Sequence, residues 1–191
     1  MKNRVLAAFL LCFASSVAQV TSQHKNRQQF TGSWWLAANP GERDGFVNGV
    51  ADCMTWEAGK KGYSATPEQL SGKITRFYEG NLSAQKLLVV DVWQQIARKE
   101  RPASSRESGE RWNNPHWYMD GAWWGQLAVT EQTGFLTGYL WCMRTQVEKS
   151  HPSYTKPVSF YQRKIDAFFE AHPNMSKETI AKTLTRYQNA Q

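Results

Sequence analysis

The sequence predicts an all-α protein made of two tandem three-helix repeats related by a pseudo-twofold axis. Three observations predict this class. Two phrases recur along the chain, apolar residues recur at intervals of three and four, and helix-capping residues stand where apolar stretches begin. The chain has 191 residues, of which 41% are hydrophobic and 13% aromatic, enough to bury a core.

The repeat is visible in two pairs of phrases. GSWW, which begins at Gly32, returns as GAWW at Gly121, and GFVNGVADCM at Gly45 returns as GFLTGYLWCM at Gly134. Every identical pair is separated by the same 89 residues. Identities at one fixed spacing, which include a Trp pair and a Cys, predict that the chain is built twice from one unit.

Composition divides the chain into five segments. Residues 1–18 combine a charged start, a short apolar run and small residues at the end, which predicts a secretory signal peptide cleaved near Ala18. Residues 19–30 form an N-terminal extension and residues 31–98 the first helical repeat. Residues 99–119 are rich in Pro, Ser and charge, which predicts a linker, and residues 120–191 form the second repeat.

The signal peptide predicts a periplasmic or secreted protein. Its removal takes away two of the 23 basic residues and none of the 16 acidic ones, which leaves a net charge of +5. Such a charge is typical either of an ordinary soluble surface or of attraction to an acidic partner or an anionic cell envelope. Nucleic acid is not an expected partner, because no binding motif is present. No later apolar run has the roughly 20 residues of a membrane-spanning helix.

Apolar spacing and caps predict the helices of each repeat. In the phrase that begins at Gly45, apolar residues recur every three or four positions, which predicts a first helix. The capping box Thr66–Gln69, with Pro at the first helical position, predicts the start of a second helix that ends near Gly80. Ser83 and Ser176 are the predicted caps of the third helix in the two repeats.

Four glycines lie one helical turn apart in pairs: Gly45 with Gly49, and Gly134 with Gly138. Glycine costs about 1 kcal/mol relative to alanine inside a helix. Its use at matched positions indicates close approach of another group. Either the first helices of the two repeats cross there, or each pair accepts a bulky side chain of its own repeat.

Cys53 and Cys142 occupy equivalent positions of the two repeats. Equivalent residues meet only near the axis that relates the units, and an exported protein would oxidise them there. Such a disulfide would add roughly 4–5 kcal/mol in the chain-entropy model. The alternative is two separate buried thiols, each packed as a small apolar side chain.

The sequence predicts no catalytic residue, no metal ligand and no cofactor. It has none of the familiar hydrolase, zinc, haem or phosphate-loop motifs. His116 and Asp120 lie one helical turn apart, but a single such pair favours a surface or capping role over metal binding or acid–base chemistry.

The aromatic residues fall into two groups. Trp34-Trp35 and Trp123-Trp124 recur in register and are predicted to be mainly core. The candidates for binding a partner or ligand have no counterpart in the first repeat and lie in the linker: Trp112, Trp117 and Tyr118. They suit a protein partner or sugar stacking, although packing of the linker against the domain would also use them.

The phrases TGSWWLAANPGERDGFVNGVADCMTW, YSATPEQLSGKITRFYEGN and SAQKLLVVDVWQQIAR of the first repeat resemble a known family. It is the small periplasmic immunity-protein domain of the Rap/Tai kind, which protects bacteria against peptidoglycan amidases delivered by type VI secretion. The family's leucine pair is replaced by Trp34-Trp35, and its usual cysteines near Ala38 and Arg43 are missing. The matching positions are Thr31, Gly32, Gly45, Phe46, Gly49, Val50, Asp52, Thr66, Gln69, Leu70, Ser83 and Ala84.

The resemblance implies an exported, non-enzymatic helical protein that binds another protein, with a cell-wall-degrading amidase effector as the implied partner. The alternative hypothesis is a periplasmic glycan- or peptidoglycan-binding module that uses the linker aromatics. Binding to purified sacculi that weakens in Trp112→Ala and Trp117→Ala would favour the alternative.

Overall fold

The computed structural model describes residues 30–57, 65–99, 119–148 and 153–190. Regular structure in these ranges is helical apart from two isolated β-bridges, which confirms the all-α class. The first half contains α2 (Gly32–Ala37), α3 (Pro40–Trp56), α4 (Pro67–Gly80), the 3-10 helix η1 (Leu82–Lys86) and α5 (Val89–Ala97). The second half contains α8 (Gly121–Trp124), α9 (Val129–Cys142), the π-helix η3 (Met143–Val147), α10 (Val158–Ala171), the 3-10 helix η4 (Pro173–Met175) and α11 (Ile180–Thr185).

Each half has four α-helices in the described ranges, so the prediction of three per repeat is wrong. The additional helix is the short segment with the Trp pair, α2 in one half and α8 in the other. Thr31 accepts a hydrogen bond from the Trp34 N–H and so caps α2, and Asp120 accepts one from the Trp123 N–H and caps α8. A polar cap on a segment of one or two turns satisfies amides that would otherwise be left without partners.

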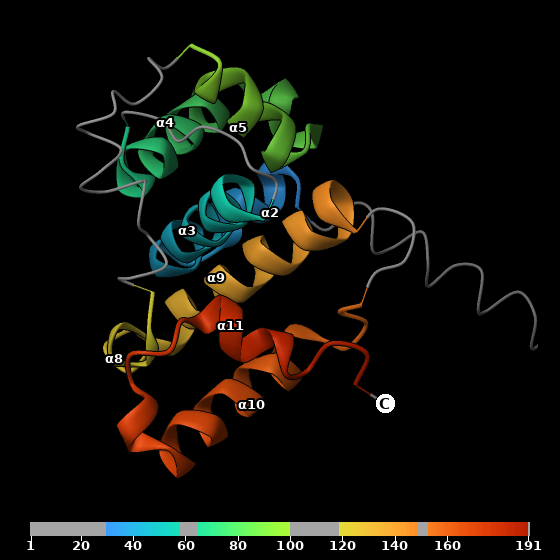
Figure 1. Cartoon of the computed structure of the whole chain (residues 1–191). Helices are drawn as coiled ribbons and strands as arrows, with labels where there is room; N and C mark the ends of the chain where they lie inside the picture. The colour runs from blue at the N-terminus through green and yellow to red at the C-terminus, as the bar shows by residue number, and fades with distance from the viewer. Residues whose placement is uncertain (1–29, 58–64, 100–118, 149–152, 191) are drawn as a thin grey trace, which may run out of the picture.

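The centre of the molecule is the pair α3 and α9. Figure 1 shows them side by side across the middle, with α4 and α5 on one side and α10 and α11 on the other. Asn39 caps α3, and Pro40 stands at its first position. Consecutive residues from Gly45 to Met54 are almost all buried, so α3 is covered on every face and is not a one-sided amphipathic helix.

The four paired glycines lie where the backbones of α3 and α9 meet. A β-carbon at Gly49 would overlap the carbonyl oxygen of Phe135 and lie 2.7 Å from the Tyr139 nitrogen. A β-carbon at Gly138 would overlap the carbonyl oxygen of Phe46. At these two glycines the nearest atoms belong to the backbone of the opposite helix and not to a bulky side chain. The same holds at Gly45 and Gly134.

Cys53 and Cys142 join α3 to α9. Their sulfur atoms lie at bonding distance, 2.05 Å apart, their Cα atoms are 6.1 Å apart, and both residues are fully buried. The sulfurs meet two turns beyond the first glycine of each pair. The alternative of two separate thiols is therefore not what the structure contains.

Several contacts of the first half recur in the second. The buried indole of Trp35 donates to Thr75 of α4, and that of Trp124 donates to Asp166 of α10. Isolated β-bridges close both halves, Thr31 with Leu88 and Asp120 with Thr179. The Trp pairs are core as predicted, although Trp34 and Trp123 are only half-buried.

The predicted caps of the third helix are wrong. Ser83 lies inside η1 and Ser176 follows η4, while α5 and α11 begin several residues later. Thr179 caps α11 by accepting from the Lys182 N–H. A tight turn precedes α5 and another precedes α11, so Ser83 and Ser176 mark these turns and not the helix starts.

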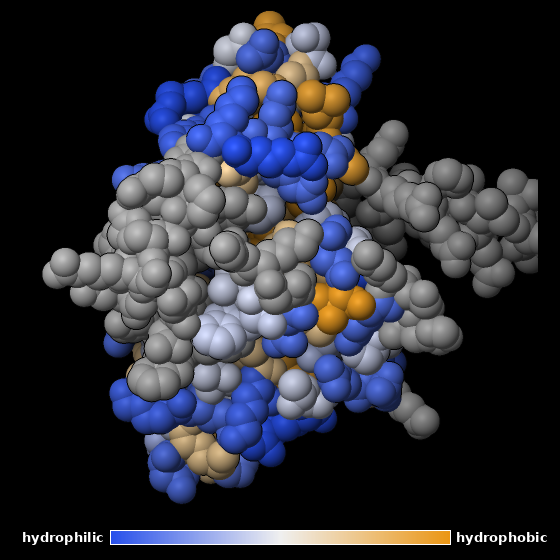
Figure 2. All heavy atoms as spheres, turned by 45° about the horizontal axis from the view of Figure 1, so that its top comes forward, coloured by the Kyte–Doolittle hydropathy of each residue, from blue (hydrophilic) through white to orange (hydrophobic). Residues whose placement is uncertain are grey.

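The described surface is mostly polar. Figure 2 shows a face with mainly hydrophilic side chains and a few separate apolar spots. Leu82 and Val129 are the most exposed large apolar residues of the described chain, at 77% and 69%. In the same part of the chain, no helix combines the length and apolar character that crossing a membrane requires.

Candidate functional site

A groove with a volume of about 790 Å³ lies between the two halves. The first half contributes Phe30 and the start of α5, and the second half contributes the end of α9, η3 and the segment that leads into α10. Its apolar residues come from both halves, whereas its acidic residue comes from the first half and its basic residues come from the second. The lining residues are Phe30, Leu88, Val90, Asp91, Thr137, Trp141, Arg144, Thr145, Thr155, Lys156, Pro157 and Val158.

Backbone hydrogen bonds fix the wall of the first half. The Val89 N–H donates to the carbonyl of Phe30 at 2.7 Å, and Gly32 donates to the carbonyl of Leu87 at 3.0 Å. This pairing holds Phe30 beside the first turn of α5. Phe30 and the start of α5 are thus positioned as one wall.

Arg144 organises the opposite wall. Its Nε donates to the carbonyl of Tyr154 at 2.6 Å and its Nη2 to the carbonyl of Lys156 at 2.9 Å. The Tyr161 hydroxyl accepts from the Lys156 N–H at 3.1 Å. These bonds hold the segment before α10 against η3, and they fix the position of the Lys156 backbone.

Burial acts on the charge of Arg144. Removal from water lowers the pKa of the guanidinium, and the Tyr161 and Glu148 side chains only partly offset this effect. Glu148 is itself hydrogen-bonded to the Ser153 N–H and hydroxyl. The groove therefore contains a partly desolvated positive charge, which a further anion would stabilise.

Two helices begin at the groove without a side-chain cap. Leu88 and Pro157 are the N-caps of α5 and α10, and neither side chain accepts a hydrogen bond from a first-turn amide. The partial positive charge of a helix N-terminus adds to that of nearby cations. First-turn amides of five other described α-helices donate to the side chains of Thr31, Asn39, Thr66, Asp120 and Thr179. At α9, Glu131 accepts from the N–H of the N-cap residue Ala128 instead.

A second, smaller hollow of about 350 Å³ lies between α4 and α5. Phe77 and Ile96 form its apolar part, and its other lining residues are all basic: Lys73, Arg76 and Lys99. Both hollows thus combine apolar surface with an excess of positive charge.

The site residues predicted from the sequence divide into two groups. The glycines and cysteines lie in the core between α3 and α9, away from the groove lining. Trp112, Trp117 and Tyr118, like the signal peptide, lie outside the described residues, so glycan binding by the linker stays a prediction. His116 lies there too, while Asp120 is buried as the cap of α8, with Lys177 Nζ 3.8 Å from its Oδ2.

Three buried tyrosines of the core have shifted pKa values. Burial raises the pKa values of Tyr78, Tyr139 and Tyr154. At Tyr139 the charges of Glu57 and Asp52 raise it further, and its hydroxyl donates to Glu57. A phenol with a raised pKa stays protonated at neutral pH. The Tyr78 hydroxyl donates to the Leu87 carbonyl, whereas the Tyr154 hydroxyl accepts from the Gln188 side chain. No set of His, Cys, Asp and Glu that could hold a metal ion occurs within the described ranges.

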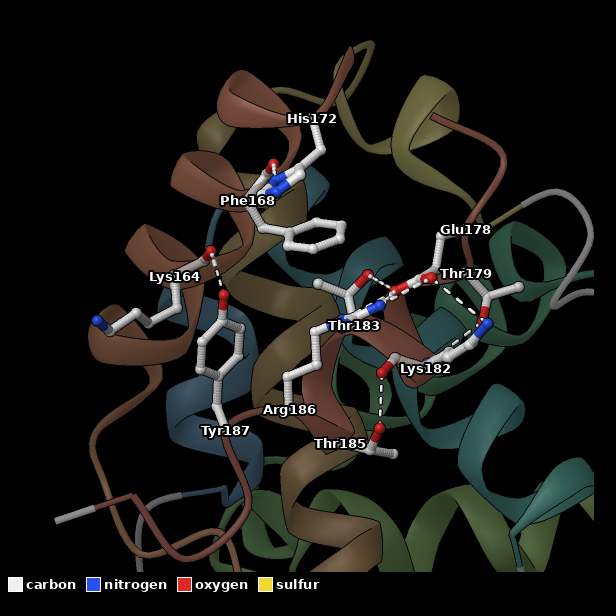
Figure 3. A network of polar contacts seen from close by, with 10 residues as sticks. All are labelled: Lys164, Phe168, His172, Glu178, Thr179, Lys182, Thr183, Thr185, Arg186 and Tyr187. Carbon is white, nitrogen blue, oxygen red and sulfur yellow. Dashed lines mark hydrogen bonds and ion pairs between the residues drawn. The ribbon is translucent and has the colours of Figure 1, made fainter. Parts of the chain in front are cut away.

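Outside the groove, an ionic cluster lies around the last helix, α11, with Glu178 just before it and Arg186 just after it. Figure 3 shows Glu178 facing Arg186 and Lys182. Arg186 Nη2 lies 2.9 Å from Oε1 of Glu178, and Lys182 Nζ lies 3.4 Å from Oε2. The Glu178 side chain is only 5% exposed. Burial favours its protonated form, but the hydrogen bonds and charges of Arg186 and Lys182 outweigh burial and lower the pKa of Glu178.

A lowered folded-state pKa makes this cluster sensitive to acid. Its stabilisation is complete above the unfolded pKa of about 4.3 and is lost as the pH falls through the folded value. We expect Glu178→Gln to lower the free energy of unfolding by about 1 kcal/mol at pH 7, since Arg186 is partly solvated. Urea unfolding of the wild type and of Glu178→Gln at pH 7, 5, 4 and 3 measures this difference in the free energy of unfolding. Equal losses of stability in both proteins between pH 5 and pH 3 would contradict the assignment.

Sequence reasoning did not find the groove residues, but one signal was present. Trp141 and Arg144 stand where the first half of the chain has Asp52 and Thr55, at the offset of 89 residues. Positions that differ between otherwise matching helices indicate a role that one half alone performs. Lys156 carries no comparable signal, because its place depends on the fold of an irregular segment.

The chain was also compared with known proteins. No family model, no curated protein and no solved structure matches it. A functional proposal therefore rests on the residues of this chain.

Proposed function

We propose that the chain is an exported binding protein that holds a segment of another protein in the groove between its halves. The observation that carries the proposal is the groove itself, which two halves tied through their core form together. The partner class that we propose is a cell-wall-degrading effector of the amidase kind, on the basis of the resemblance to periplasmic immunity domains.

The properties of the groove support this role. Its volume of about 790 Å³ lies within the roughly 300–1,000 Å³ of binding pockets. Trp141 and Arg144 belong to the residue types that dominate binding energy at interfaces. Their neighbours are held by backbone bonds, so little ordering would be needed when a partner binds.

We propose further that the halves are diverged copies related by a pseudo-twofold axis. The glycine contacts support this because they are reciprocal. Gly49 faces Phe135, and Gly138 faces Phe46, which is the equivalent of Phe135. Divergence after duplication would explain why the groove is lined differently by each half.

Protection of cells tests the proposed function. Candidate amidase effectors are directed to the periplasm of a bacterial host, with and without the full-length chain. We expect the chain to restore growth against at least one effector and to bind it in purified form. Thr145 is exposed at the groove, so Thr145→Trp should fill the groove and abolish protection.

The matched control is Arg163→Trp, an equally large change at an exposed position of α10 outside the groove. It should protect as well as the wild type. Failure of the wild-type chain to bind or protect against any candidate effector would overturn the proposed partner class.

A further inference from the structure

We propose that the groove recognises an acidic, apolar segment of its protein partner, with a carboxylate held by Arg144 and Lys156 and an adjacent apolar side chain packed against Trp141. This inference rests on the proposed function and adds the chemistry of the bound segment. The observations that support it are the residues that line the groove and the distribution of charge among them.

Arg144 has hydrogen-bonding capacity left for a ligand. A guanidinium carries five N–H donors in a planar fork. Two of the donors go to the carbonyls of Tyr154 and Lys156 and a third goes to the Tyr161 hydroxyl, which leaves two for a ligand. The backbone bonds hold the fork in place, so a carboxylate would meet a preorganised donor.

Lys156 supplies a second cation whose side chain is not needed for the fold. Its structural bonds run through its backbone, since its N–H donates to Tyr161 and its carbonyl accepts from Arg144. The uncapped start of α10 follows directly and adds partial positive charge. Positive potential thus gathers on the wall of the second half.

Asp91 gives the groove a direction. It is the acidic lining residue and belongs to α5 of the first half, whereas the cations belong to the second. A carboxylate is therefore attracted to one wall and repelled by the other. Apolar residues from both walls receive the side chains beside it: Phe30, Leu88, Val90, Trp141 and Val158.

Charge complementarity favours this occupant over a basic or a purely apolar segment. The lining carries two cations against one carboxylate, and the hollow between α4 and α5 is basic as well. A basic segment would leave the desolvated charge of Arg144 opposed by a like charge, which is unfavourable in a partly buried site.

Selection from a random dodecapeptide library tests the inference. The mature chain, residues 19–191, is immobilised and the enriched peptides are synthesised. We expect them to combine Asp or Glu with aromatic or branched apolar residues. Affinity for these peptides should fall at least tenfold in Lys156→Glu and rise severalfold in Asp91→Asn.

The decisive feature is that Lys156→Glu is expected to lower the affinity and Asp91→Asn to raise it. Damage to the fold would weaken binding in both variants, whereas the proposed electrostatics move them in opposite directions. Arg163→Glu is the matched control, because it changes the charge as Lys156→Glu does at an exposed position of α10 outside the groove. It should leave affinity unchanged after correction for the salt dependence of binding.

Three results would overturn the inference: enrichment of basic peptides, binding that Lys156→Glu does not weaken, or failure to enrich any peptide. Tight binding of glycan fragments in place of peptides would overturn it as well. Acidic peptides that bind the groove without any protection against effectors would refute the proposed partner class and retain the groove chemistry. Protection that survives Lys156→Glu would refute the groove chemistry alone.

Discussion

Replacement of both Cys53 and Cys142 by alanine is expected to lower the free energy of unfolding by about 4–5 kcal/mol. The disulfide closes a loop that spans 89 residues, so its loss releases a large amount of chain entropy in the unfolded state. Urea unfolding of residues 19–191 under non-reducing conditions measures the difference.

Reductant provides the control for this prediction. It should lower the stability of the wild type to that of the double variant and leave the double variant unchanged. Two reactive thiols in denatured, non-reduced wild-type protein would show that the bond is absent and would contradict the prediction.

Gly49→Ala is expected to destabilise the fold by about 2–3 kcal/mol. Its new methyl group would overlap the carbonyl oxygen of Phe135, and a backbone atom within a helix cannot move aside alone. The helices α3 and α9 would have to separate, which would loosen the centre of the core. Thermal and urea unfolding measure the change.

Gly72→Ala is the matched control, because Gly72 lies inside α4 and only the tip of Arg76 comes near the added carbon, at 3.5 Å. Alanine should stabilise that helix by about 0.5–1 kcal/mol. The two substitutions are chemically the same and differ only in what surrounds them. If both stabilised the protein equally, the close crossing of α3 and α9 would be contradicted.

The sequence predicted best the features that depend on local chemistry or that recur in both halves of the chain. The class, the capping box of α4 and the meeting of Cys53 with Cys142 all follow from local chemistry or from comparison of the two halves of the sequence. Each repeated glycine and cysteine needs an explanation at two positions at once, which restricts the alternatives.

The features that the sequence predicted poorly depend on turns and on tertiary packing. Ser83 looks like a cap, but η1 uses the segment as a tight turn and leaves Leu82 exposed. The groove depends on how two helix starts face η3, which spacing along one helix does not encode. Arg144 shows this most clearly, because its partners are carbonyls of an irregular segment.

The proposed binding of an amidase effector in the groove is tested most directly with an effector that residues 19–191 bind. Its amidase activity on purified sacculi is titrated with that chain and three variants. We expect stoichiometric inhibition by the wild type, at least tenfold weaker inhibition by Lys156→Glu, tighter inhibition by Asp91→Asn and no change in Arg163→Glu. Equal inhibition by the wild type and Lys156→Glu would contradict it, because the groove would then not be where the partner binds.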